Sequence, residues 1–192
     1  MSAAEAGAAA VLNTPDAWST RAATIDDPCE VVRWSPQGQA ARFAEILRVL
    51  RPRPGETLLD YGCGLGALSD LLPDDVGYLG FDWSPGMVRR ARRERPGREF
   101  TTFLPFHPFN LIAVVGTFNL ADRWTKDRTW SIIRHLWLTT GCRSLAASLY
   151  AGEDPDCLSY TVEECNRFVI KTSSVGQVRR WRDNDILLEI GR

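Results

Sequence analysis

Residues 58–66 read Leu-Leu-Asp-Tyr-Gly-Cys-Gly-Leu-Gly, an apolar strand that runs into three glycines at alternate positions. Glycine tolerates positive φ and lets a ligand approach the backbone closely. The N-terminus of a helix after such a turn also offers unpaired N–H groups to an electron-rich partner. Asp60, two residues before the first glycine, adds a carboxylate beside the same crevice. The stretch therefore predicts a strand-to-helix turn that binds a ligand.

A second apolar segment, residues 76–81, ends in Asp82. If the two strands are parallel neighbours, Asp82 lies at the tip of the second strand, where a carboxylate suits the hydroxyls of a ribose. The spacing Gly62-x-Gly64-x-x-Ala67 also satisfies the dinucleotide-binding fingerprint, whose last position accepts alanine. The glycines alone therefore leave the identity of the nucleoside open.

These segments resemble the class I S-adenosylmethionine-dependent methyltransferases. Residues 58–66 look like the first motif of that family. Residues 78–87, Tyr-Leu-Gly-Phe-Asp-Trp-Ser-Pro-Gly-Met, look like the second motif and are the more specific match. Residues 109–120 look like the fourth strand and its site-facing end. The resemblance covers nearly the whole chain after about residue 34 and implies S-adenosylmethionine as cofactor and S-adenosylhomocysteine as product.

The resemblance also implies how the cofactor is held. Asp82 would bind the ribose hydroxyls, and Trp83 would pack on the adenine with Met87 nearby. Many relatives carry an acidic residue after the third strand, but residues 103–109 offer none, so adenine recognition would rest on backbone groups and apolar stacking. The implied cofactor-binding residues are Asp60, Tyr61, Gly62, Cys63, Gly64, Gly66, Asp82, Trp83, Met87, Gly116 and Thr117.

Two other functions compete with methyl transfer. A short-chain dehydrogenase would need a Tyr-x-x-x-Lys pair, and no tyrosine in the sequence has a lysine four residues later. A non-catalytic, methyltransferase-like nucleoside-binding domain stays an alternative. Within the enzyme class we expect a small-molecule O or N nucleophile as acceptor, in a role such as biosynthetic tailoring, with RNA or protein as the alternative.

Helical and strand periodicities alternate along the chain, which is typical of a parallel sheet with crossover helices. We expect a three-layer, Rossmann-like α/β sandwich. Its mostly parallel seven-stranded sheet would receive an antiparallel strand from a C-terminal hairpin. Residues 1–33 are expected to form a tail and cap segment, and residues 34–192 a single methyltransferase domain. The expected helices are 36–50, 65–72, 87–95, 126–139 and 161–171, and the expected strands 57–61, 76–81, 99–103, 111–115, 143–150, 175–181 and 186–190.

Few side chains are candidates for acceptor chemistry. His107 lies between the third and fourth predicted strands, at the ligand end, and is a candidate base. Asn119 follows the fourth strand, and Tyr160 is a weaker candidate from the opposite side. Gln39 and Arg42 lie on one face of helix 36–50, where Arg42 could pair with a carboxylate of the cofactor or the substrate. The candidate catalytic residues are His107, Asn119 and Tyr160, and the candidate substrate-binding residues Gln39, Arg42, Asn119 and Trp124.

The amino-acid composition limits the binding partners that we expect for this protein. The net charge of the 192 residues is −1, which argues against bulk affinity for nucleic acid. Residues 89–98 hold six arginines, which we interpret as a solvated helix face. The five cysteines form no Cys-x-x-Cys pair, so we predict no metal site and a cytoplasmic protein. No apolar run approaches the roughly 20 residues of a membrane span. The seven tryptophans leave a homodimer open.

Overall fold

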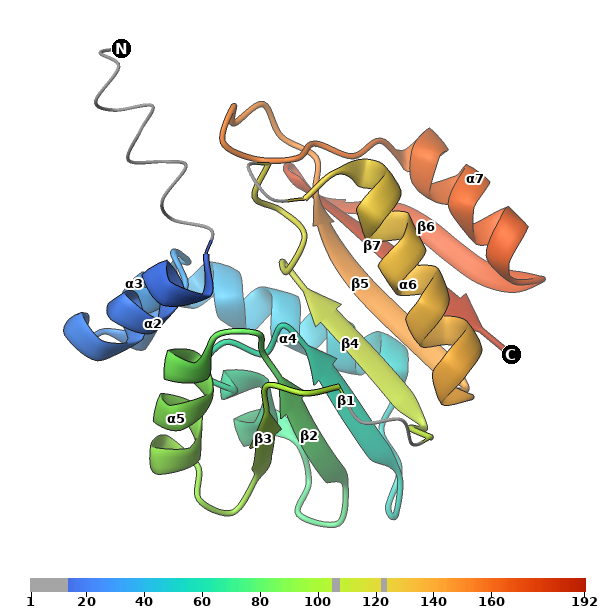
Figure 1. Cartoon of the computed structure of the whole chain (residues 1–192). Coiled ribbons are helices and arrows are strands. Elements are labelled where there is room, and N and C mark those ends of the chain that lie inside the picture. Colours follow the sequence, from blue (N-terminus) through green and yellow to red (C-terminus); the bar gives the residue numbers. More distant parts are fainter. Residues whose placement is uncertain (1–13, 105–107, 122–123) are drawn as a thin grey trace.

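A seven-stranded sheet forms the centre of the computed structural model, which describes residues 14–104, 108–121 and 124–192. The strand order is β3-β2-β1-β4-β5-β7-β6 (Figure 1). Strands β1 to β5 pair in parallel, β7 is antiparallel to β5, and β6 is antiparallel to β7. The predicted sheet and its antiparallel hairpin strand are therefore confirmed. The predicted base His107 lies outside the described residues.

The strands are β1 Thr57–Tyr61, β2 Gly77–Phe81, β3 Glu99–Thr101, β4 Leu111–Val115, β5 Ser144–Tyr150, β6 Val175–Arg182 and β7 Asp185–Gly191. The helices are α2 Pro15–Thr24, α3 Pro28–Val31, α4 Pro36–Leu50, α5 Pro85–Glu94, α6 Lys126–Thr140 and α7 Val162–Thr172, with a 3₁₀ helix η1 at Ala67–Leu71. A capping box of Thr161 and Glu164 starts α7, as its sequence predicts.

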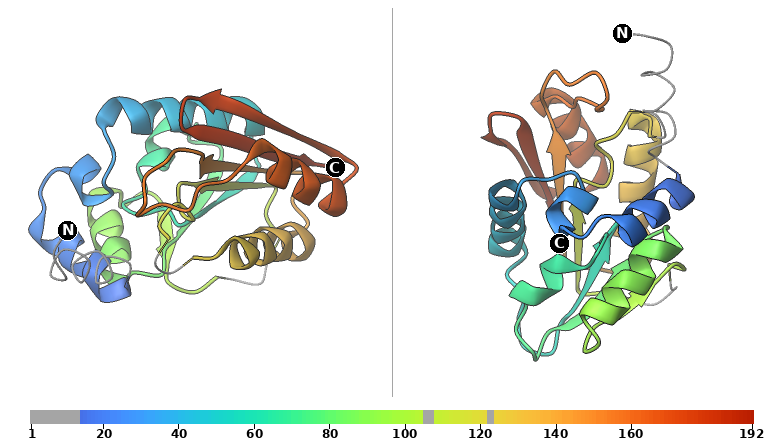
Figure 2. Two further views of the ribbon diagram at one scale, coloured as in Figure 1. Left: turned by 90° about the horizontal axis from the view of Figure 1, so that it is seen from above. Right: turned by 90° about the vertical axis from the view of Figure 1, so that its left-hand side faces the viewer.

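The sheet is covered on both faces, because its strands alternate buried side chains between two cores. Leu111 and Ala113 of β4 pack in one core with side chains of α4, η1 and α5. Ile112 and Val114 pack in the other core with side chains of α6 and α7. The two further views show the helices on either side of the sheet (Figure 2). This is the predicted three-layer α/β sandwich.

The crossover after β1 differs from the sequence prediction. Residues 65–72 were expected to form a helix, but only the five-residue 3₁₀ helix η1 forms. Gly66 has φ 80° immediately before it, and Leu72 is already extended immediately after it. The segment is too short to propagate an α-helix between these two ends. A run of unpaired helical N–H groups aimed at a ligand is therefore not formed here.

The N-terminal helix α2 packs against α5, and α3 packs against α2 (Figure 1). The guanidinium of Arg90, which is only 8% exposed, donates hydrogen bonds to the carbonyl oxygens of Ala22, Ile25 and Asp26. Arg92, Arg95 and Arg98 likewise donate to backbone carbonyls, those of Phe100, Leu65 and Val76 among them. The interpretation of residues 89–98 as a merely solvated face is therefore wrong for these four arginines, which connect α5 and the turn after it to neighbouring segments, whereas Arg89 and Arg93 are exposed.

Candidate functional site

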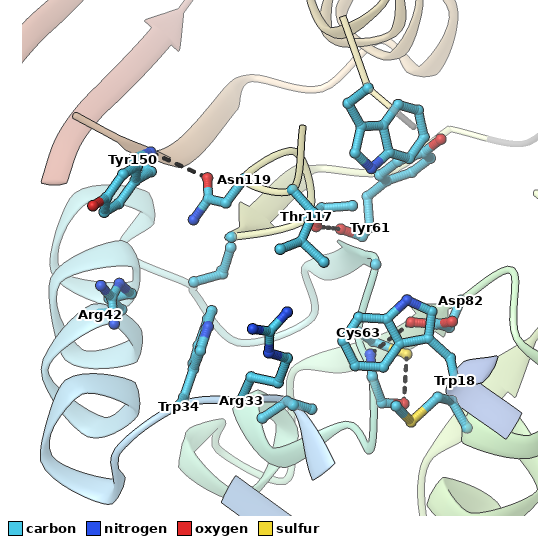
Figure 3. A pocket seen from close by; sticks show the side chains of 18 of the residues that line it. Trp18, Arg33, Trp34, Arg42, Tyr61, Cys63, Asp82, Thr117, Asn119 and Tyr150 are labelled. Atoms are coloured by element: carbon cyan, nitrogen blue, oxygen red, sulfur yellow. Dashed lines mark hydrogen bonds between the residues drawn. The ribbon is translucent and has the colours of Figure 1, made fainter. Parts of the chain in front are cut away.

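A cavity of about 480 Å³ opens at the carboxyl ends of β1, β2 and β4. The crevice outside the carboxyl ends of parallel strands is the usual ligand site of such sheets. Its volume lies within the range of small-molecule and cofactor sites. Figure 3 shows side chains from the N-terminal helices, the glycine turn and the ends of β4 and β5 converging on it.

The glycine turn after β1 forms the floor of the cavity. Gly62 and Gly64 have φ values of 80° and 55°, which residues with a side chain rarely adopt. The N–H groups of Gly62 and Cys63 both donate to the carbonyl oxygen of Phe81, at 2.7 and 2.9 Å. A Cβ on Gly62 would overlap with the side chain of Thr117, across the turn. The turn therefore brings bare backbone against the cavity, while its own N–H groups are used to fix it to β2.

Asp82 connects the glycine turn to the start of α5. Its carboxylate accepts one hydrogen bond from the N–H of Gly64 and one from the N–H of Ser84, both at 2.9 Å. The side chain lines the cavity although the residue is only 6% exposed, and burial raises the pKa of Asp82 to about 6. A carboxylate has about four lone-pair sites, so Asp82 keeps acceptor capacity for ligand hydroxyls after both backbone bonds.

Asp60 is the second carboxyl group in the cavity wall. It accepts a hydrogen bond of 2.8 Å from the hydroxyl of Tyr78. Burial raises the pKa of Asp60 to about 7, and the nearby charge of Asp82 adds to the shift. Burial likewise raises the pKa of the Cys63 thiol. The charges of Asp60 and Asp82 therefore depend on pH near neutrality, whereas the Cys63 thiol stays protonated there.

Aromatic rings form the walls. Trp34, between α3 and α4, packs so closely on the end of β4 that a Cβ on Gly116 would overlap with its ring. Trp18 of α2 lines the same cavity and packs against an apolar cluster that includes Leu65 and Met87 (Figure 3). Trp83 and Trp124 lie with their ring centroids 6.4 Å apart. Trp18 and Trp34 were open from the sequence as an aromatic interface or a substrate wall but were not among the predicted site residues, because only the docking of the N-terminal segment brings them to the cavity.

Asn119 is held in a defined orientation at the far end of the cavity. Its side-chain oxygen accepts a hydrogen bond of 3.1 Å from the N–H of Tyr150. The amide nitrogen is thereby left on the cavity side, where it can donate (Figure 3). The backbone of Asn119 also accepts from Leu158 at 2.7 Å, which holds the loop after β5 against it.

Arg42 is committed to a partner within the protein. Its guanidinium pairs with Asp185, which is only 2% exposed, through contacts of 2.9 to 3.1 Å. It also lies 5.0 Å from the ring centroid of Trp34, a cation–π distance. Arg42 therefore faces the cavity, as predicted, with its charge balanced by Asp185. Its first role is to hold Trp34 and to connect α4 to β7.

The cavity collects most of the residues predicted for it. Of the predicted cofactor-binding residues, only Gly66 does not line it, because a Cβ there would instead overlap with the ring of Phe100. The predicted substrate-binding residues Gln39, Arg42, Asn119 and Trp124 all line it. Lining residues that the sequence prediction did not include are Trp18, Val32, Arg33, Trp34, Phe43, Phe81, Val115, Leu120, Arg128, Ile132, Tyr150, Asp154, Asp156 and Cys157.

The expectation that Tyr160 reaches the cavity is wrong. The residue is 1% exposed and belongs to the core between the sheet and helices α6 and α7. Its hydroxyl lies 2.9 Å from the Thr129 hydroxyl and donates to the carbonyl oxygen of Phe118 at 3.2 Å. Tyr160 directly precedes the N-cap residue of α7, and its hydroxyl is bound within the core.

Known proteins share this fold. A demethylmenaquinone methyltransferase of Beutenbergia cavernae is 40% identical over 81 residues, which cover 40% of this chain and 34% of that protein. The N-methyltransferase NodS from Bradyrhizobium japonicum WM9, solved with S-adenosylhomocysteine, has a TM-score of 0.69 at 14% identity, covering 94% and 98% of the two chains. The magnesium protoporphyrin IX methyltransferase of Synechocystis PCC 6803, also with S-adenosylhomocysteine, has a TM-score of 0.67 at 14% identity, covering 97% and 98%. No protein-family model matches the chain.

The fold and the cavity define the class: the chain has the Rossmann-like fold of the class I S-adenosylmethionine-dependent methyltransferases. The resemblance seen in its sequence motifs is thereby confirmed. The curated relative is matched over about a third of its length, so it identifies no particular substrate for this chain.

Proposed function

We propose that the protein binds S-adenosylmethionine and transfers its methyl group to a small-molecule oxygen or nitrogen nucleophile. The observation that carries this proposal is the junction of Asp82 and the glycine turn. A buried carboxylate with free acceptor capacity lies beside bare backbone, and a Cβ at Gly62 would overlap with the Thr117 side chain. These residues fit a nucleoside with a ribose diol. The relatives solved with S-adenosylhomocysteine support the same ligand.

Different residues of the chain would bind the ribose, bind the adenine and orient the two reactants. The cofactor, when bound, supplies an activated methyl group on a sulfonium centre. Asp82 would accept the ribose hydroxyls, and Trp83 and Met87 would form an apolar wall for the adenine. Thr117 is fixed by a hydrogen bond of 2.7 Å from its hydroxyl to the carbonyl oxygen of Tyr61. The glycine turn and the end of β4 would thus present a rigid surface that orients the two reactants, which is the main way a protein accelerates such a displacement.

The far end of the cavity supports a small acceptor with a flat apolar part and an acidic group. Trp34 and Trp124 provide ring surfaces, and Asn119 provides an amide donor. The Arg33 guanidinium points into the cavity (Figure 3), from a residue with φ 61°, a conformation uncommon for a side-chain-bearing residue. Within residues 14–104, 108–121 and 124–192 no carboxylate forms an ion pair with Arg33. An acceptor carboxylate or ionised hydroxyl would supply that partner.

Parallel calorimetric titrations with S-adenosylmethionine, S-adenosylhomocysteine and NAD test the cofactor. We expect micromolar binding of the first two ligands and none of NAD. Binding of NAD alone would overturn the proposal. Transfer of a radiolabelled methyl group to a panel of phenols, carboxylic acids and amines, with RNA and protein as further arms, then tests the acceptor. Incorporation only into RNA or protein would contradict a small-molecule substrate.

The cellular location and the oligomeric state are separate proposals. Within the described part of the chain, no helix is both long enough and apolar enough to cross a bilayer. We propose a cytoplasmic location on the five reduced cysteines alone. Homodimer formation stays a proposal, which sedimentation of the full chain would test.

A further inference from the structure

We propose that Asn119 selects the reacting atom of the acceptor: the protein methylates an oxygen, bound as an oxyanion such as a phenolate or a carboxylate, and not the nitrogen of an amine. This inference rests on the proposed function, since it concerns the acceptor of the same methyl transfer. It goes beyond that function, which leaves an oxygen or a nitrogen nucleophile open. The observation that carries it is the orientation of one side-chain amide.

The amide of Asn119 can take only one orientation. Its partner is the backbone N–H of Tyr150, a donor that requires an oxygen opposite it, and the side-chain Oδ1 lies 3.1 Å from that nitrogen. The backbone carbonyl oxygen of Asn119 accepts from the N–H of Leu158 at 2.7 Å. The side-chain nitrogen donates to no other described residue. Two N–H donors are therefore available to a ligand in the cavity that Asn119 lines (Figure 3).

The turn that carries Asn119 is fixed to the glycine turn of the cofactor end. The N–H of Asn119 donates to the carbonyl oxygen of Gly116 at 3.3 Å, so residues 116–119 form one tight turn after β4. Thr117, inside this turn, donates its hydroxyl to the carbonyl oxygen of Tyr61 at 2.7 Å and lies against Gly62. Asn119 is consequently held at a set distance from the glycine turn, as a group that positions the acceptor against the cofactor must be.

Charged side chains of both signs line the same cavity. Arg33 and Arg128 can attract an anion, and Asp154 and Asp156 can attract an ammonium group. All four residues are exposed, so water and salt weaken their discrimination between acceptors. The amide of Asn119, which the backbone holds in one orientation, is therefore the group that decides between oxygen and nitrogen.

Oxygen and nitrogen acceptors differ in the number of lone pairs that they offer. A phenolate or carboxylate oxygen can accept a hydrogen bond from Asn119 with one lone pair and attack the methyl carbon with another. A neutral amine nitrogen has a single lone pair, so it cannot do both. Its own N–H groups would also face the amide donors without an acceptor, which is costly in a cavity. The orientation of Asn119 consequently favours an oxygen.

Methyl transfer to an oxyanion needs no general base at the moment of reaction. The oxygen lone pair forms the new O–C bond while the C–S bond breaks, and the electron pair of that bond stays on sulfur as a neutral thioether. The negative charge of the acceptor and the positive charge of the sulfonium cancel. The acceptor has already released its proton to water on binding. The hydrogen bond from Asn119 to the ionised form favours that release, because it lowers the pKa of the acceptor.

Asn119→Asp tests the amide by a change that keeps the shape of the side chain. Aspartate keeps an oxygen opposite the N–H of Tyr150, but it replaces the two N–H donors by a second carboxylate oxygen. Asn110→Asp is the matched control. The side-chain oxygen of Asn110 likewise accepts from a backbone N–H, that of Thr57 at 2.8 Å, but Asn110 directly precedes β4 at its opposite end and does not line the cavity.

The readout is the binding of 4-nitrophenol and 4-nitroaniline to the full-length protein saturated with S-adenosylhomocysteine. The probes differ only in the group that would meet Asn119, and the visible absorbance of 4-nitrophenol reports its ionised form. We expect the wild type and Asn110→Asp to bind the nitrophenolate about tenfold more tightly than the aniline and to ionise it at a lower pH than water does. Asn119→Asp should weaken nitrophenolate binding by about 10- to 150-fold and leave aniline binding unchanged or stronger.

A third probe, 4-nitrobenzoate, distinguishes a carboxylate from a phenolate as the source of the oxyanion. Equal binding of nitrophenolate and nitroaniline by the wild type, or binding of no probe, would overturn the inference, and this comparison holds even if Asn119→Asp does not fold. An unchanged preference in a folded Asn119→Asp would overturn it as well, and so would a product methylated at nitrogen or carbon. If the wild type does not bind S-adenosylhomocysteine, the proposed function fails instead.

Discussion

Replacement of Asp82 by Asn separates cofactor binding from folding. Asparagine keeps the shape of the side chain and one acceptor oxygen, but it removes the negative charge and places an amide donor at the other position. The ribose would then lose the equivalent of one charge-assisted hydrogen bond, which contributes about 1.5–3 kcal/mol. We therefore expect the dissociation constant of S-adenosylhomocysteine to rise by about 10- to 150-fold, measured by calorimetry at pH 7.5.

Stability should change in the opposite direction from affinity. The pKa of Asp82 is raised by burial from 3.8 to about 6, so the folded chain binds this proton more tightly than the unfolded chain does. The stabilising effect of the bound proton is complete below about pH 4 and is lost as the pH rises through about 6. Ionisation of the buried Asp82 carboxyl destabilises the folded chain by at most about 3 kcal/mol at neutral pH, and asparagine avoids this cost. The variant would lose the hydrogen bond with the Gly64 N–H, which offsets part of its gain in unfolding free energy.

Denaturant unfolding and ligand titration between pH 4.5 and 8 check both expectations. The difference in unfolding free energy between Asp82→Asn and the wild type should shift in favour of the variant as the pH rises from 4.5 to 7. Wild-type affinity for S-adenosylhomocysteine should fall below about pH 6, as the carboxylate is protonated, and the affinity of the variant should not. A variant that binds the ligand within twofold of the wild type would refute the placement of the ribose at Asp82.

Three further substitutions address other parts of the site. Gly62→Ala would overlap with the Thr117 side chain at a residue with φ 80°, so we expect loss of measurable S-adenosylhomocysteine binding together with a lower melting temperature. Tyr160→Phe removes the hydroxyl that contacts the buried Thr129 hydroxyl and the Phe118 carbonyl oxygen. Loss of these hydrogen bonds should lower the unfolding free energy by about 1–3 kcal/mol. The substitution should leave the turnover rate unchanged, and a large fall in turnover at equal stability would restore Tyr160 as a catalytic candidate. Arg33→Gln should raise the KM of an acidic acceptor at least tenfold and leave the cofactor affinity within twofold, and the reverse pattern would assign Arg33 to the cofactor.

The sequence predicted the parts of the fold that depend on local patterns. The strand and three glycines at residues 58–66, and the strand that ends in Asp82, were placed correctly, because a buried parallel strand and its glycine turn have strong local signals. The hairpin of β6 and β7 was also predicted correctly. The helix expected at residues 65–72 was wrong, because two conformational breaks close to each other prevent propagation, whatever the apolar pattern between them.

Arg90 and Tyr160 show where prediction from the local sequence fails. The arginine-rich face of α5 looked like a solvated surface, but Arg90 reaches backbone carbonyls of a segment more than sixty residues earlier in the chain. Tyr160 looked like a residue beside the site, and the packing of α6 and α7 buries it. In both cases the deciding partner belongs to a distant segment, which no window of sequence contains.

The sequence by itself determined the class of fold and the residues at the strand ends that would hold a nucleoside, because strand periodicity, glycine turns and carboxylates at strand tips are encoded within a few neighbouring residues. Only the tertiary structure decided which distant side chains share the cavity. It brought Trp18 of α2 and Arg33 and Trp34 of the segment between α3 and α4 into one cavity with Asn119 and Tyr150, and it paired Arg42 with Asp185. The physical reason is that these contacts depend on how the helices pack against one another and against the sheet. That packing is determined by side-chain contacts and hydrogen bonds between segments that are distant in the sequence.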